Sequence, residues 1–243
     1  MGVLRVDHPD IGRFCTAKRR EGALANFNVS VGVTDAFYSA VQEGSRYTLT
    51  NPSSGDPHRV TEATAQFYSA DYETASPTKV EANLWRDFVG ETSRLEPYRG
   101  KTNLSVGEAM TLPARFVWEL IIDGAWRNGE PGLFALDATN REHSFDVERY
   151  PSHRIEATNP CGEQGLEEYE ACTLGHVNLS LMAADQLSPW FEFRADDEVD
   201  LSAAVDAFLE QAIDWERLTR VVHDGTRFLD NVVTVSRFPI EDI

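Results

Sequence analysis

The sequence predicts an α/β fold, because predicted strands and helices alternate along the chain. Residues 26–33 alternate with period two and are rich in β-branched side chains, as is typical of a strand. Apolar residues then recur at helical spacing from Phe116 to Gly124, and the apolar run 133–137 predicts a buried strand. The 243 residues are enough for one large or two small domains with a sizeable core.

The first elements follow one another closely. Residues 1–6 are apolar and predict an extended segment. Asp7 suits a helix N-cap and Pro9 suits the first turn, and Thr34 or Asp35 would cap a second helix after the strand at 26–33. The apolar positions of these two helices are Ile11, Phe14 and Cys15, then Phe37, Tyr38 and Val41.

The middle of the chain gives weaker signals. Residues 47–57 form a turn-rich connector, and residues 59–102 show no clean period. The next clear helix should begin near Pro113, which suits a first turn, and should end at Gly129.

The last part of the chain is predicted to be mainly helical. Residues 177–182 are apolar and short, and residues 189–200 are acidic and irregular, which favours a loop. Residues 201–229 predict helix, with interruptions near 214–215 and 224–225.

The composition excludes several classes of partner. Asp and Glu total 40 against 22 Lys and Arg, so the formal net charge is −18. So acidic a surface repels nucleic-acid phosphates and anionic lipids, and we expect neither nucleic acid nor membrane as a partner. The scarcity of lysine (Lys18, Lys79 and Lys101) favours adaptation to a high-salt cytoplasm, with an ordinary acidic cytosolic protein as the alternative.

The expected location is the cytoplasm. Residues 1–7 lack the long apolar stretch of a signal peptide, and no run approaches the ~20 apolar residues that span a membrane. The cysteines are odd in number in a chain too large to need disulfides, so free thiols in a reducing compartment are expected.

Residues 159–178 hold two of these cysteines, Cys161 and Cys172. Pro160 and Gly162 flank Cys161, which disfavours a helix or a central strand and favours a tight loop presenting a thiol. Residues two apart on an extended or tightly turned segment tend to face the same side. Asn159, Cys161 and Glu163 could therefore converge on one small substrate.

Other interpretations of these residues remain open. Free cysteines are often buried structural thiols, and a zinc site is conceivable although His176 is the only histidine close to the cysteines. Glu163 could be a solvated carboxylate, as we expect of Glu167, Glu168 and Glu170. Cys15 is expected to belong to the core or the surface, without a redox role.

The loop resembles the finger loop of ribonucleotide reductase catalytic subunits, most closely of the adenosylcobalamin-dependent (class II) kind. There, Asn-Pro-Cys-Gly-Glu-Gln precedes Cys-(Asn/Thr)-Leu-Gly-x-(Ile/Val)-Asn-Leu, and residues 159–164 and 172–179 match. Thr173, His176 and Gly165 replace the commoner Asn, Ser and Pro. Further blocks that resemble the family are residues 4–11, 26–31, 125–140 and 227–240.

The resemblance implies a fold and a reaction. The whole chain, 1–243, would be part of the family's ten-stranded α/β barrel domain, with the finger loop at about 156–180. The reaction would reduce ribonucleotides to deoxyribonucleotides by a thiyl-radical mechanism. The implied roles are Cys161 as the thiyl radical, Glu163 as the base, Asn159 as the hydrogen-bond partner of the sugar hydroxyls and Cys172 as one half of the reducing dithiol.

The resemblance also implies partners. Adenosylcobalamin would supply the radical, although no cobalamin signature is visible, and no metal site is expected. The substrate would be a ribonucleoside di- or triphosphate, with a thioredoxin-type reductant, a nucleotide effector and a homodimer or complementary fragments in the parent enzyme. Other parts of the family pattern have no match, so we expect a fragment or one piece of a split gene, with little activity alone. The alternatives are a non-catalytic fragment and a class I subunit that uses a partner subunit's radical.

Overall fold

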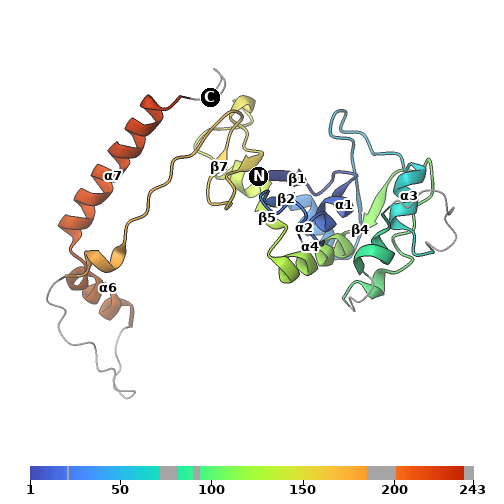
Figure 1. Ribbon diagram of the computed structural model, residues 1–243, viewed down its shortest axis with the longest axis horizontal. Helices are drawn as coiled ribbons and strands as arrows, with labels where there is room; N and C mark the ends of the chain where they lie inside the picture. The colour runs from blue at the N-terminus through green and yellow to red at the C-terminus, as the bar shows by residue number, and fades with distance from the viewer. Residues whose placement is uncertain (21, 72–81, 90–93, 185–200, 238–243) are drawn as a thin grey trace, which may run out of the picture. The chain divides into compact units, whose positions relative to one another are not determined.

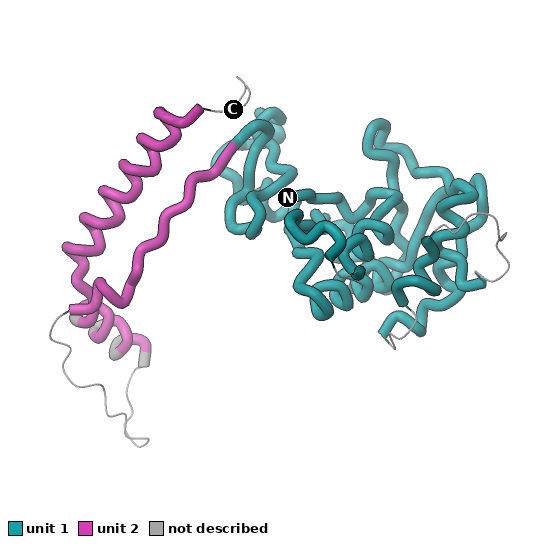
Figure 2. Tube along the Cα trace, viewed as in Figure 1, with its two compact units in different colours: residues 1–170 teal, residues 171–243 magenta. Residues whose placement is uncertain are grey.

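The computed structural model describes residues 1–20, 22–71, 82–89, 94–184 and 201–237. The chain divides into two compact units, residues 1–170 and 171–243, which Figure 2 shows in separate colours.

A parallel sheet organises the first unit, with β2 between β1 and β5 (Figure 1). Val31 in the middle of β2 lies opposite Leu4 on one side and Leu133 on the other. All of β2 is buried, as expected of a parallel strand covered on both faces. The strands are β1 (Gly2–Arg5), β2 (Val29–Val33) and β5 (Gly132–Ala135).

Helices α1 (Ile11–Thr16), α2 (Asp35–Glu43) and α4 (Ala114–Asn128) accompany this sheet (Figure 1). The predicted helices are confirmed, as is the Thr34 cap, whose side chain accepts a hydrogen bond from the amide of Phe37 at 3.2 Å. The remaining elements of this unit are β3 (Arg46–Thr48), α3 (Glu62–Tyr68), a π-helix (Trp85–Val89), a 3-10 helix (Glu96–Tyr98), β4 (Thr111–Pro113), α5 (Leu136–Arg141), a 3-10 helix (Pro151–His153), β6 (Ala157–Thr158) and β7 (Gly165–Leu166).

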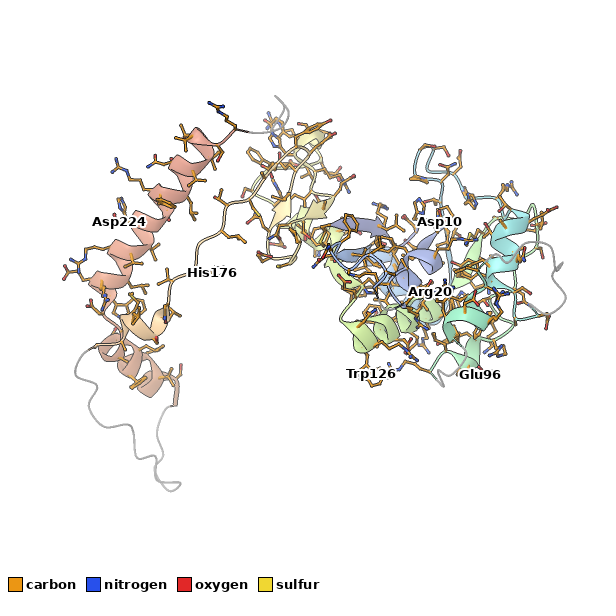
Figure 3. The ribbon with its side chains drawn as sticks, in the orientation of Figure 1. Asp10, Arg20, Glu96, Trp126, His176 and Asp224 are labelled. Carbon is orange, nitrogen blue, oxygen red and sulfur yellow. The ribbon has the colours of Figure 1, made fainter. Side chains whose placement is uncertain are left out.

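Both ends of α4 follow from local chemistry. Pro113 precedes the helix and also ends β4, instead of lying in the first turn as predicted. Gly129 ends the helix with φ of 81°, a left-handed conformation that glycine adopts without a Cβ clash. On the outer side of the helix Trp126 is 83% exposed and is labelled in Figure 3.

The core of the first unit is rich in aromatic side chains. Trp85 and Phe116 are both almost fully buried and stack with their ring centroids 6.0 Å apart. The indole of Trp85 donates hydrogen bonds to the Tyr68 carbonyl at 3.1 Å and to Thr102 Oγ1 at 3.0 Å. Residues 59–102, which lacked a clear period, therefore supply a large share of this core.

Two predictions near the sheet are wrong. Asp7 does not cap α1, because its carboxylate binds Arg5 at 2.8 and 3.1 Å and the helix starts only at Ile11. The predicted buried strand at 133–137 ends at Ala135, and Leu133 is half exposed. The reason is that β5 is an outer strand of the described sheet.

The second unit contains a 3-10 helix (Leu179–Met182), α6 (Leu201–Ala212) and α7 (Trp215–Val235). The predicted break at 214–215 is confirmed, and the Asp214 side chain accepts a hydrogen bond from the amide of Arg217. The predicted interruption at 224–225 is wrong, because α7 continues through Gly225. A glycine weakens an exposed helix by only about 1 kcal/mol, which a long helix tolerates.

The loop predicted at residues 189–200 and the end of the family-like block, residues 238–240, lie outside the described residues. No helix in the described part of the chain has the length and apolarity needed to cross a membrane. The observed architecture is mixed α/β, as predicted. The described residues contain one three-stranded parallel sheet and not a closed ten-stranded barrel, so the barrel, its finger loop and the single 1–243 domain stay predictions.

Candidate functional site

The Cys161 loop, residues 159–164, joins β6 to β7, which pair antiparallel. Asn159 closes this loop with three hydrogen bonds of 3.1 Å each. Its backbone N–H donates to the Gln164 carbonyl, and its backbone carbonyl accepts from the Gly162 N–H. Its side-chain Oδ1 accepts from the backbone N–H of Gln164. The backbone of the loop is therefore held by Asn159 and not by the side chains at its tip.

The tip exposes the two groups expected to react. Cys161 is an exposed free thiol, and Glu163 is exposed two residues later. Gly162 between them has φ of 86°, a conformation that favours glycine. The exposure of Cys161 does not fit a buried structural thiol.

Asn159 differs from these two residues in its surroundings. Its side chain is buried, with 3% relative exposure for the residue, and its Nδ2 has no hydrogen-bond partner among the described residues. The thiol of Cys161 and the carboxylate of Glu163 are thus exposed at the tip. The amide of Asn159, although close to them in the sequence, is buried. A buried donor without a partner is rare, because it forfeits its hydration.

Two asparagines attach this loop to the rest of the unit. Asn28, just before β2, donates from Nδ2 to the Pro160 carbonyl at 3.1 Å. Buried Asn140 in α5 donates to the Leu136 and Ile155 carbonyls at 2.9 and 2.8 Å and accepts from the Ile155 amide at 2.9 Å. The chain that leads into β6 is therefore fixed to a helix at the carboxyl end of β5.

Glu167 was expected to be a solvated carboxylate, and this expectation is wrong. Its side chain is only 17% exposed and lies 2.8 Å from His153 Nδ1 and 3.5 Å from His143 Nε2. Glu168 and Glu170 are exposed, as expected. Sequence reasoning missed both histidines, because they lie 24 and 14 positions before Glu167 (167 − 143 and 167 − 153) and no local pattern connects them.

The other two cysteines belong to other parts of the chain. Cys15 in α1 is buried, and burial raises the pKa of its thiol to about 12, which confirms that it belongs to the core. Cys172 is partly exposed and, like His176 (labelled in Figure 3), belongs to the second unit. In the described part of the chain, no three His, Cys, Asp or Glu side chains are grouped as metal ligands.

A cavity of about 680 Å³ lies near the carboxyl ends of β2 and β5. Arg141 in its wall pairs with Asp35 at 2.7 Å, and the Asp35 amide donates to Asp137 at 2.9 Å. The wall contains four carboxylates and two arginines, so the cavity is poorly suited to an anionic phosphate group. Its lining includes Asp35, Asp137, Arg141, Asp146, Glu148 and Arg154.

A family model described as "Ribonucleotide reductase, barrel domain" matches residues 1–243. The chain is 31% identical over 244 residues to the vitamin B12-dependent ribonucleoside-diphosphate reductase of Thermoplasma acidophilum, and 32% identical over 244 residues to the enzyme of the same name from Mycobacterium tuberculosis. All of the chain is covered in both cases, but it spans only 22% and 24% of the length of these relatives.

A shorter match is 39% identical over 72 residues to a putative adenosylcobalamin-dependent ribonucleoside-triphosphate reductase of Mycobacterium phage D29. It covers 30% of this chain and 9% of that relative. None of these matches supports the expected adaptation to high salt.

Proposed function

Because the chain belongs to the ribonucleotide reductase family, we propose that it carries the reactive loop of a vitamin B12-dependent reductase that converts ribonucleotides to deoxyribonucleotides. The observation that carries the proposal is the Cys161 loop, which exposes a thiol and a carboxylate on either side of a left-handed glycine. The relatives matched over the whole chain are named as B12-dependent, which favours this class over a reductase that uses a partner subunit's radical.

Cys161 would begin and end the reaction. Loss of the ribose 2′-hydroxyl becomes feasible once a radical lies on the neighbouring 3′ carbon. A Cys161 thiyl would take the 3′ hydrogen, so that a C–H bond breaks and an S–H bond forms, and would return that hydrogen to the 3′ carbon at the end. Adenosylcobalamin, when bound, supplies the unpaired electron by homolysis of its cobalt–carbon bond. The exposed sulfur of Cys161 fits this role, since it is open to a bound cofactor.

Glu163 would act as the base. Its carboxylate would accept the 3′-hydroxyl proton while the 2′-hydroxyl takes a proton from one reducing thiol and leaves as water. Cys172 and a second thiol would in total supply this proton, a second proton for the 2′ carbon and two electrons, and would become a disulfide. The balance is one ribonucleotide and two thiols giving one deoxyribonucleotide, one disulfide and one water.

Asn159 would hold the sugar. Its Nδ2 is a buried hydrogen-bond donor without a partner in the described structure, and a ribose hydroxyl placed against it would supply the missing acceptor. Asn159 also closes the loop through Oδ1, so the same side chain would both hold the loop backbone and bind the substrate.

We infer a ribonucleoside diphosphate as the substrate, because the Thermoplasma acidophilum and Mycobacterium tuberculosis relatives, which match the whole chain, are named for diphosphates, whereas the phage relative named for triphosphates matches 30% of it. A thioredoxin-type reductant, a nucleotide effector and a cytoplasmic location go with this proposal. Because the chain spans only 22% and 24% of the length of these two relatives, we expect the activity to require the rest of a reductase.

The test is a hybrid enzyme in which this chain replaces the matching segment of the Mycobacterium tuberculosis relative. With adenosylcobalamin, a dithiol and a 3′-tritiated ribonucleoside diphosphate, the hybrid should form deoxyribonucleotide that retains the label at the 3′ carbon. Cys161→Ala and Glu163→Gln should each abolish product formation, whereas Glu168→Gln, at an exposed position, should not. A Cys161→Ala hybrid with unchanged turnover would overturn the proposal.

A further inference from the structure

The segment just after β7 carries a polar cluster that the proposed reaction does not use. Glu167 lies 2.8 Å from His153 Nδ1 through Oε2 and 3.5 Å from His143 Nε2 through Oε1. These three residues are named here the Glu167 clasp. The Glu167 amide is also bound, since it donates to Glu170 Oε2 at 2.8 Å. Both its backbone and its side chain are therefore restrained.

The hydrogen bonds around the clasp fix which ring nitrogens carry protons. His143 Nδ1 accepts a hydrogen bond from the Phe145 amide at 2.9 Å, so the proton of a neutral ring is on Nε2, which faces Glu167. An ionised carboxylate only accepts hydrogen bonds, so His153 Nδ1 must donate to it. The carboxylate thus meets an N–H group from each ring without requiring a positive charge on either.

Aromatic packing holds the ring of His153 in this arrangement. His153 stacks on Phe145 with ring centroids 4.1 Å apart and an interplanar angle of 13°. Tyr150 contacts the same imidazole edge-on, with centroids 6.4 Å apart. A ring fixed between two neighbours loses little further rotational freedom when its N–H group binds a carboxylate, so the hydrogen bond is pre-organised.

The hairpin that carries the Cys161 loop needs such support. β6 and β7 pair over only two residues each, Ala157 with Leu166 and Thr158 with Gly165. So short a two-stranded ladder is not stable by itself in water. Asn140 fixes the chain before β6, and the clasp fixes the chain directly after β7. The two attachments hold the hairpin at both of its ends.

We propose that Glu167 is a positioning residue, and that the clasp fixes the outgoing strand of the hairpin so that Cys161 and Glu163 are presented in a constant place. The inference rests on the proposed function only in taking this loop to be the reactive one. It assigns a role to residues outside the matched Asn-Pro-Cys-Gly-Glu-Gln block.

Hydrogen–deuterium exchange of the 243-residue chain tests the proposal without turnover. Glu167→Gln replaces one acceptor oxygen by an NH₂ group, so that two hydrogen-bond donors, this group and an imidazole N–H, would face each other. We expect amides of residues 157–166 to exchange roughly tenfold faster or more, as follows from losing a charge-assisted hydrogen bond. Glu168→Gln is the matched control, because it removes the same charge at an exposed neighbouring position, and it should leave the rate unchanged.

A second variant separates the clasp from general stability. His153→Phe preserves a ring for the Phe145 stack but removes the N–H donor, and it should accelerate exchange at 157–166 as Glu167→Gln does. The double variant should show little further change, because both substitutions break the same bond. Exchange in β2 should stay slow throughout.

Two results would overturn the proposal. One is equal exchange at 157–166 in Glu167→Gln and Glu168→Gln. The other is acceleration of the hairpin and β2 by the same factor, which would make Glu167 a contributor to global stability. Both are independent of the hybrid assay, so a failed reductase proposal and a failed clasp would be recognised separately.

Discussion

Asn140→Ala is the substitution whose effect on the site can be worked out most directly. The Asn140 side chain is buried and makes three hydrogen bonds of 2.8–2.9 Å, two as donor and one as acceptor. Alanine can make none of them. The amide and carbonyl of Ile155, a buried residue just before β6, would lose their partners.

The magnitude follows from these bonds. A net contribution of about 1 kcal/mol for each gives about 3 kcal/mol of lost unfolding free energy. With a urea m-value of about 2 kcal/mol/M, the midpoint should fall by about 1.5 M. Asn140→Asp should be damaging too, because a carboxylate still accepts from the Ile155 amide but cannot donate to the two carbonyls.

The assay is urea unfolding followed by tryptophan fluorescence, to which the buried Trp85 contributes a signal from the first unit. Asn128→Ala is the control, because that side chain is exposed. It donates to the Lys18 carbonyl at 2.9 Å and accepts from the Glu130 amide at 3.2 Å, and in an exposed setting the loss of these bonds should cost about 1 kcal/mol or less. A midpoint for Asn140→Ala within 0.2 M of the parent, on the order of the error of the method, would refute the reasoning.

Three further outcomes are expected, each read from urea unfolding. Stability should fall as the pH rises above 9, because the Cys15 thiol ionises near its ordinary pKa of 9.0 when unfolded and only near 12 when buried; Cys15→Ala should weaken this dependence, and an unchanged profile would contradict it. Asp123→Asn should cost about 3–5 kcal/mol by leaving buried Arg19 without its carboxylate, and a loss below 1 kcal/mol would count against the pair. Thr34→Ala should cost about 1 kcal/mol through the lost α2 cap, whereas Thr61→Ala, at the cap of α3, should serve as a comparison of similar size.

The parts of the fold that the sequence predicted correctly depend on neighbouring residues. Thr34 caps α2 through an amide three positions away, and Gly129 ends α4 by its own backbone conformation. The exposed thiol between Pro160 and Gly162 follows from the same local rules. Such features can be recognised in a single sequence because the interaction partners lie within one turn.

The parts that it did not predict depend on distant partners. Asn140 contacts Ile155 across 15 positions (155 − 140), and nothing nearby distinguishes it from a solvated asparagine. Glu167 stands among other acidic residues, and only the fold shows that it alone is half enclosed by two histidines. Asp7 is an exception, because its competing partner is local: the guanidinium of Arg5, two positions away, binds the carboxylate that was predicted to cap α1.

The closure of the Cys161 loop by Asn159 has a consequence for protein engineering. All three closing bonds begin or end on Asn159, and none involves the side chains of Cys161 or Glu163. Shape and reactivity are therefore encoded at different positions, with Gly162 as the one tip residue that the backbone constrains. A combinatorial library at positions 161 and 163 should sample new nucleophile and acid pairs, such as serine with histidine, on one unchanged loop.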